Sequence, residues 1–276
     1  MKKNSAASKW MDREAVERLL KSYRGEEDVK RIKNTLIEQV QSGNAVVVEV
    51  LGEALRNHRK LTDQKHAARL LAEIGTNEAV DVLYAAGSKD AVKISVFAVW
   101  EIEQHAGAKP ALLGALRAMD SLDINVQGMA MVAGLARFRN ENKKKEEDRD
   151  VELCKQLREL GKQVLLKGMQ SGHPFIRELA AGRMAQDFAD DGEVLKALFK
   201  LMKDEMPEVR MAARRTLEKV REKEVEEGKA SITLRDYFEK MPELPKAGGQ
   251  TFVLQRNRQS GRFNFVQGAP LKRMVY

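Results

Sequence analysis

Apolar residues recur along most of this chain at the three- and four-residue spacing that places them on one face of a helix. The first segments with this spacing cover residues 12–25, 29–43 and 44–55. The third contains Val46-Val47-Val48, a β-branched cluster typical of a strand, yet Val47, Val50 and Leu51 fall on one helical face. We therefore expect all three segments to be helices.

A short pattern then recurs five times: an apolar residue, a basic or amide residue, and small and aliphatic residues at helical spacing. The copies begin at Gln64-Lys65, Val92-Lys93, Val126-Gln127, Ile176-Arg177 and Val209-Arg210, of which the first has a polar residue in the apolar position. The steps between them are 28, 34, 50 and 33 residues. Periods of roughly 20–50 residues are typical of stacked helical units. The sequence therefore predicts an all-α fold, a right-handed α-solenoid of helical hairpins over residues 10–225.

The longest step contains a strongly charged segment, Arg139–Asp150, with five basic and five acidic residues and no apolar anchor. We interpret it as a solvated insertion, or as a polar extension of the helix that holds Cys154. A docking role for this segment is a further alternative.

Three of the repeated segments carry a resemblance to a known family. They are Asp90–Lys93, His173–Arg177 and Met206–Arg210, the last continued by the alanine-rich Met211–Arg215. Over roughly residues 44–225 the chain resembles the HEAT-repeat family, in particular the short bacterial repeats that also occur in phycobilisome-lyase-like proteins. Members of this family serve as scaffolds, lyase subunits, regulatory subunits or, in a HEAT-like branch, DNA glycosylases. The resemblance therefore implies one of these roles, and the fold alone does not choose among them.

The net charge of +8 is unevenly distributed along the chain. Residues 1–9 contribute +3 and residues 246–276 contribute +6, both without an acidic residue, which leaves −1 on residues 10–245. We expect residues 1–9 to form a flexible basic N-terminus. The basicity of the chain therefore describes its two ends and says little about the repeats.

The C-terminal residues have a different pattern. In residues 226–250 we expect a short helix, 234–241, followed by a proline- and glycine-containing linker. Residues 251–276 form a basic, aromatic arm in which Thr251–Arg256 and Arg262–Val266 flank a glycine-containing turn, so they predict a small β-hairpin or an irregular extension. Because a single hairpin is marginal in water, it should pack on the last repeat as a cap, or bind an acidic partner or RNA.

Candidate partner-binding residues lie on the last repeats and in this arm. They are Arg177, Arg210, Arg214, Arg256, Arg258, Arg262, Phe263, Phe265, Lys272 and Arg273. The repeated cations have an alternative role as an internal ladder, in which each one bonds a carboxylate of a neighbouring turn, and the neutral Gln127 interrupts any basic stripe. The carboxylates considered for that ladder are Asp63, Asp90, Asp123 and Asp204.

Little in the sequence points to catalysis. His58, His66, His105 and His173 have no metal-ligand spacing, Cys154 is the single cysteine, and no glycine-rich phosphate loop precedes a helix. No stretch approaches the roughly 18 apolar residues of a membrane span. We expect a cytoplasmic, non-enzymatic scaffold or adaptor without metal or cofactor, which binds a protein.

Two alternatives stay open. The first is a nucleic-acid-binding protein that uses the arm. The second is a HEAT-like lyase or DNA glycosylase, for which Trp100 with Glu101 or Glu103 is the best match.

Overall fold

The computed structural model describes residues 10–22, 26–57, 61–87, 92–143, 150–188, 190–226, 251–256 and 263–268. Apart from two short strands near the C-terminus, the elements of these residues are helices, which confirms the predicted all-α class for the repeats. The helices are α1 (Arg13–Ser22), α2 (Glu26–Gln41), α3 (Val46–Asn57), α4 (Leu61–Ile74), α5 (Asn77–Ala85), α6 (Val92–His105), α7 (Ala108–Ala118), α8 (Ile124–Asn142), α9 (Val151–Met169), α10 (Pro174–Leu179), α11 (Gly192–Leu201) and α12 (Pro207–Glu226).

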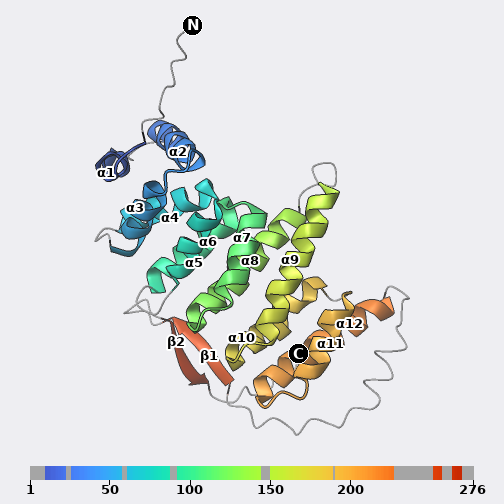
Figure 1. The fold of residues 1–276 in the computed structure, drawn as a ribbon. Coiled ribbons are helices and arrows are strands. Elements are labelled where there is room, and N and C mark those ends of the chain that lie inside the picture. The colour runs from blue at the N-terminus through green and yellow to red at the C-terminus, as the bar shows by residue number, and fades with distance from the viewer. Residues whose placement is uncertain are drawn as a thin grey trace.

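The helices follow one another across the molecule in chain order, from α1 and α2 at one end to α11 and α12 at the other (Figure 1). Each odd-numbered helix contacts the next odd-numbered helix, and each even-numbered helix contacts the next even-numbered one. The repeated basic or amide residues all lie on even-numbered helices. A single cluster of buried apolar side chains extends from Val16 in α1 to Val220 in α12. Every helix pair therefore buries its apolar face against its neighbours.

Helix ends follow the polar residues that predict them. Ala15 N–H donates to Asp12 Oδ1 (2.8 Å) at the start of α1, and Asp123 and Asp191 cap α8 and α11 in the same way. A side-chain acceptor at this position satisfies an N–H that the helix cannot. The cluster Val46–Val48 lies in α3, as the helical spacing predicts.

The charged segment Arg139–Asp150 is shared between two helices, and the prediction of one insertion is wrong for its ends. Arg139–Asn142 form the last turn of α8, and Asp150 caps α9. The Arg139 side chain is not solvated as an insertion would be, because it forms an ion pair with Asp187. Residues 144–149 lie outside the described residues.

The helix that begins at Pro174 is broken after six residues. It leaves the α-form at Leu179 and continues as a π-helical turn, η3 (Ala180–Met184), and a 3₁₀ turn, η4 (Ala185–Phe188). Gly182 has the non-helical angles φ −82° and ψ −117°, and its carbonyl accepts a hydrogen bond from Thr216 Oγ1 of α12 (3.1 Å). The break is therefore held by a neighbouring helix.

Two strands, β1 (Thr251–Arg256) and β2 (Phe263–Gly268), pair antiparallel, with Leu254 opposite Phe265. The predicted turn between them and the predicted helix at 234–241 lie outside the described residues, as do residues 1–9. The role of the arm and its packing on the last repeat stay predictions.

Two neighbouring helices approach closely where one of them has a glycine. A Cβ added at Gly134 in α8 would lie 2.8 Å from Ala115 Cβ of α7, whereas one added at Gly128 in the same helix would meet Ile176 Cδ1 at 3.7 Å, an ordinary contact. The α7–α8 packing therefore depends on the absence of a side chain at position 134 and not at position 128.

We expect Gly134→Ala to lower the free energy of unfolding by about 1–3 kcal/mol, because the methyl group overpacks the interface. Gly128→Ala should raise it by up to about 1 kcal/mol, since alanine favours a helix interior. Urea unfolding followed by far-UV circular dichroism measures both. Equal effects of the two substitutions would contradict the close packing at Gly134.

Candidate functional site

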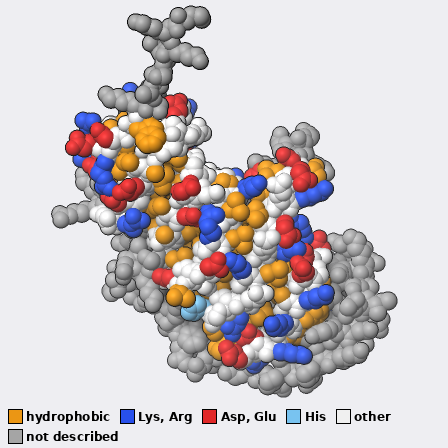
Figure 2. Space-filling view, in the orientation of Figure 1, with side chains coloured by type: hydrophobic (Ala, Val, Ile, Leu, Met, Phe, Trp, Pro, Cys, Tyr) orange, Lys and Arg blue, Asp and Glu red, His pale blue; other side chains and the backbone are white. Residues whose placement is uncertain are grey.

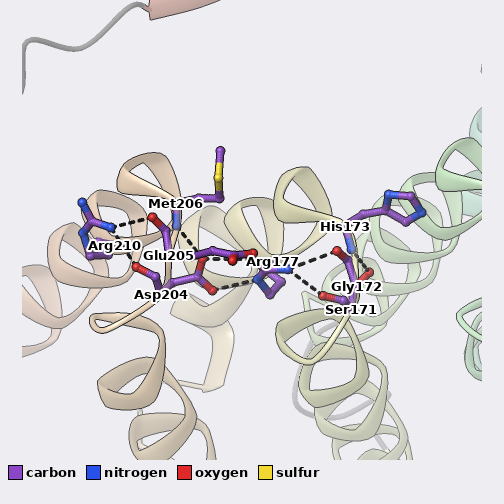
Figure 3. A network of polar contacts seen from close by, with 8 residues as sticks. All are labelled: Ser171, Gly172, His173, Arg177, Asp204, Glu205, Met206 and Arg210. Atoms are coloured by element: carbon purple, nitrogen blue, oxygen red, sulfur yellow. Dashed lines mark hydrogen bonds and ion pairs between the residues drawn. The ribbon is translucent and has the colours of Figure 1, made fainter.

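The repeated arginine of α10 bonds within the protein (Figure 3). Arg177 Nε and Nη2 donate to the two carboxylate oxygens of Asp204 (2.7 and 2.9 Å), which lies in the turn before α12. Its Nη1 donates to the carbonyls of Ser171 and Gly172 (3.0 and 3.2 Å) in the turn before α10. The Arg177 side chain is 11% exposed. One guanidinium therefore ties two successive turns together.

The pKa of the Asp204 carboxylate in this pair is lowered. Burial by itself would raise the pKa of Asp204, but the hydrogen bonds from Arg177 and from Met206 N–H outweigh burial and hold the pKa below its usual value. Asp204 therefore stays ionised and keeps its bond to Arg177.

The same column continues on both sides of Arg177. Arg210 Nη1 donates to the carbonyls of Asp204 and Glu205 (2.8 and 2.9 Å). On the other side, Gln127 Nε2 donates to Ser121 O (2.7 Å), while Gln127 Oε1 accepts from the Ser171 hydroxyl (2.7 Å).

These contacts match the internal ladder, not a basic stripe. The amide at position 127 donates to its own turn and accepts from the next one, which an arginine could not do. Arg177 and Arg210 both bond groups within the protein. The structure therefore gives no reason to interpret them as partner-binding residues. Lys65 departs from the column, since its Nζ lies 4.4 Å from the centroid of the Phe97 ring.

The other predicted partner-binding residues are distributed differently. Arg214 Nε donates to Glu218 Oε1 (2.8 Å) one turn along α12. Arg256, Phe263 and Phe265 belong to the two strands, whose side chains lie outside the described part of the structure. Arg258, Arg262, Lys272 and Arg273 also lie outside it.

A groove of about 640 Å³ lies between α10–η3 and α12. Phe175, Glu178 and Leu179 line one side, and Ala212, Arg215 and Lys219 belong to the other. Gly182, at the break in the helix, also lines the groove. Phe175 is 43% exposed. The groove therefore combines an accessible aromatic ring with charged groups of both signs.

Glu178 is the half-buried acid of this groove. Burial raises its pKa, the nearby Glu208 raises it further, and Arg215 opposes them. Among the residues that the structure describes, none forms a hydrogen bond or ion pair with the Glu178 carboxylate. Oε2 of Glu208 is buried and likewise accepts no hydrogen bond within the described structure. Sequence reasoning did not predict a half-buried acid in a groove at this position.

A second polar cluster joins α2, α4 and α6. Glu73 of α4 lies 3.4 Å from both Lys33 Nζ and Arg69 Nε, whereas Glu101 Oε2 of α6 lies 3.5 Å from His105 Nε2. Burial raises the pKa of Glu101 to about 7 and lowers that of His105. The Glu101–His105 contact is therefore not a full ion pair at neutral pH.

Trp100 is 53% exposed, and its ring meets that of His105 edge to face at a centroid distance of 5.9 Å. Trp100 lies on the opposite side of α6 from the buried Ala98 and Ile102. This cluster adds a second exposed aromatic ring beside acidic groups on the even-numbered helices.

No group of three or more His, Cys, Asp or Glu side chains among the described residues is placed to hold a metal ion. Within the same residues, no helix combines the length and the apolar character that crossing a bilayer requires.

No protein-family model matches this chain, and no curated protein matches it. The resemblance to HEAT repeats therefore has no support besides the residues that recur in the sequence.

We expect Arg177→Met to lower the free energy of unfolding by about 2–3 kcal/mol, because it leaves the buried Asp204 carboxylate without its cation. Arg117→Met is the matched control, since Arg117 pairs with Asp81 at the surface, where both side chains are more than 40% exposed. It should cost less than about 1 kcal/mol. Urea unfolding midpoints compare the two. Similar losses would argue against a special role of the ladder.

Glu101 should give the native protein a measurable pH dependence. Its native pKa of about 7 lies above the ordinary 4.5, so between these values the native state binds more protons than the unfolded state, and stability falls as pH rises. Glu101→Gln should remove this fall and gain about 1–2 kcal/mol above pH 7.

The difference between wild type and variant isolates Glu101 from His105, whose lowered pKa acts in the opposite direction, and from the facing Lys65, Arg69 and Glu73. Unfolding curves at a series of pH values measure it. Parallel pH profiles for the two proteins would show that Glu101 titrates normally.

Proposed function

We propose that this chain is a HEAT-like α-solenoid that acts as a non-enzymatic adaptor in the cytoplasm and binds another macromolecule, most simply a protein. The observation that carries the proposal is a division of roles on the even-numbered helices. The repeated polar residues of α8 and α10 each join two successive turns within the protein, and that of α12 bonds the turn before its own helix. The groove beside them instead exposes Phe175 and leaves Glu178 without a partner among the described residues.

The rest of the surface favours a protein as the partner over a polymer whose charges all have the same sign, such as a nucleic acid. Acidic and basic side chains are interspersed on the face drawn in Figure 2, with apolar groups between them. Mixed charge around exposed aromatic groups is the composition found at protein–protein interfaces. A stack of helix pairs also offers a long surface, which solenoid proteins use to bind extended partners.

Nucleic acid is a second candidate because of the charge of the arm. Residues 246–276 contribute +6 without an acidic residue and include Phe263 and Phe265. Basic groups bind phosphates and aromatic rings stack on bases, with an affinity that falls steeply as salt rises.

Affinity purification of the full chain and of residues 1–245, each with and without nuclease, tests both candidates. We expect the full chain to retain a specific protein after nuclease treatment, because the binding surface lies on the helices. Residues 1–245 should retain the same protein. The decrease in the amount retained, relative to the full chain, measures the contribution of the arm. Mass spectrometry identifies the retained proteins.

The control is an equally tagged unrelated helical protein. Retention that disappears with nuclease or with deletion of residues 246–276 would favour the nucleic-acid candidate. Retention of nothing above the control would remove the adaptor proposal.

A further inference from the structure

The segment of residues 174–188 changes its helical form twice. α10 ends at Leu179, the π-helical turn η3 follows, and the 3₁₀ turn η4 completes the segment. The even-numbered helices on either side of it, α8 and α12, are 19 and 20 residues long and have no such change. Short π-helical turns are rare and occur often at functional sites. The break is therefore a feature of this segment and not of the repeat.

The amino acids of the segment favour a continuous helix. Alanine, which has the highest helix propensity, occupies positions 180, 181 and 185, and no proline follows Pro174. The buried Ala181, Ala185 and Phe188 have the four- and three-residue spacing of one helical face. Gly182 is the only glycine of the segment. Contacts with other helices must therefore hold the break, against the local preference.

Three contacts with neighbouring helices hold the broken form. The buried Thr216 of α12 donates its hydroxyl to the carbonyl of Gly182 (3.1 Å). Arg139 of α8 pairs with Asp187, and the ring of Phe188 stacks on a phenylalanine ring of α8 at a centroid distance of 5.2 Å. The first contact acts at the break itself, and the other two fix the residues that follow it.

The carbonyl of Gly182 has a different donor in each form. Its ψ of −117° differs by about 75° from the −42° of an α-helix, so the carbonyl is turned off the helix axis, where it meets Thr216. In a continuous helix the same carbonyl accepts from the N–H of Gln186, four residues later. Both forms therefore satisfy this group, and neither leaves it without a hydrogen bond.

We propose that residues 174–188 are a two-state segment, which changes between the broken form and a continuous α-helix as the Gly182 carbonyl changes its donor from Thr216 to Gln186. Gly182 and Thr216 both line the groove between α10 and α12. A partner in the groove therefore contacts both residues of this bond, and it shifts the segment by the difference in its affinity for the two forms. The change of form does not depend on the adaptor function, since it needs no partner.

Two substitutions shift the segment by independent means. Thr216→Val removes the donor of the broken form and keeps a side chain of similar shape, so the ratio of continuous to broken form should rise about 10-fold. Gly182→Ala should raise it about fivefold, because alanine favours a helix interior over glycine. A Cβ at position 182 fits, since its nearest contact would be Ala212 Cβ at 4.0 Å.

Nuclear magnetic resonance of the deuterated full chain distinguishes the two forms, because the carbon-13 chemical shift of each Cα atom differs between helix and non-helix. In the wild type we expect helical values up to Leu179 and a non-helical value at Gly182. Both variants should move the values at residues 183–186 toward those of a helix. The double variant should move them furthest, which keeps the test sensitive where the broken form dominates in the wild type.

Matched controls alter the same groups elsewhere. Gly128→Ala adds the same methyl group to α8, which is not broken, and Thr35→Val removes a hydroxyl that bonds within α2. Neither should change the values at residues 183–186. Circular dichroism reports whether each variant folds, and Gly182→Ala decides the outcome if Thr216→Val does not fold.

Movement of residues 183–186 toward helical values in the folded variants supports the proposal. Helical values throughout residues 174–188 of the wild type overturn it, because the broken form is then absent. Unchanged values in the variants overturn it as well. So does movement toward coil values in folded Thr216→Val, which would show that Thr216 only prevents local unfolding.

Discussion

The bond from one inter-helix turn to the next is the interaction on which the rest of the structure depends. Arg177 holds two turns at once, with its own turn bound through carbonyls and the following turn bound through the carboxylate of Asp204. Apolar packing between helices is strong but not directional, and helices could slide along it. A bidentate arginine–carboxylate pair fixes both distance and orientation. The bonds of Gln127 and Arg177 therefore set how the helix pairs that they join are placed on one another, and the apolar cluster stabilises that placement.

Close helix packing makes the same point from the apolar side. Glycine at position 134 lets α8 pack closely against Ala115 of α7. Gln127 illustrates the requirement, because it both donates to the turn of Ser121 and accepts from Ser171. The identity of the residue at each rung follows from the groups that the neighbouring turn offers, which is why the repeats share a position more than a residue type.

Local physics predicted much of this chain. Caps such as Asp12 and Asp191, and the helical spacing of Val47, Val50 and Leu51, depend on residues only a few positions apart. The errors arose where distant residues decide. Arg139 belongs to α8 and pairs with Asp187, 48 residues later, and the break at Gly182 is held by Thr216, 34 residues later. The groove could not be predicted for the same reason, since residues that line it, such as Phe175 and Ala212, come together only after α10 and α12 pack.

Departures from the repeat locate function better than the repeat itself. In α8, α10 and α12 the repeated polar residue bonds groups within the protein, so these side chains are engaged there and not with a partner. The α10–η3 segment departs from its neighbours three times: its helix is broken, its glycine lines a groove, and its acid is left without a cation among the described residues. The coincidence of these departures in one segment is the reason for proposing that a partner binds there and not along the ladder.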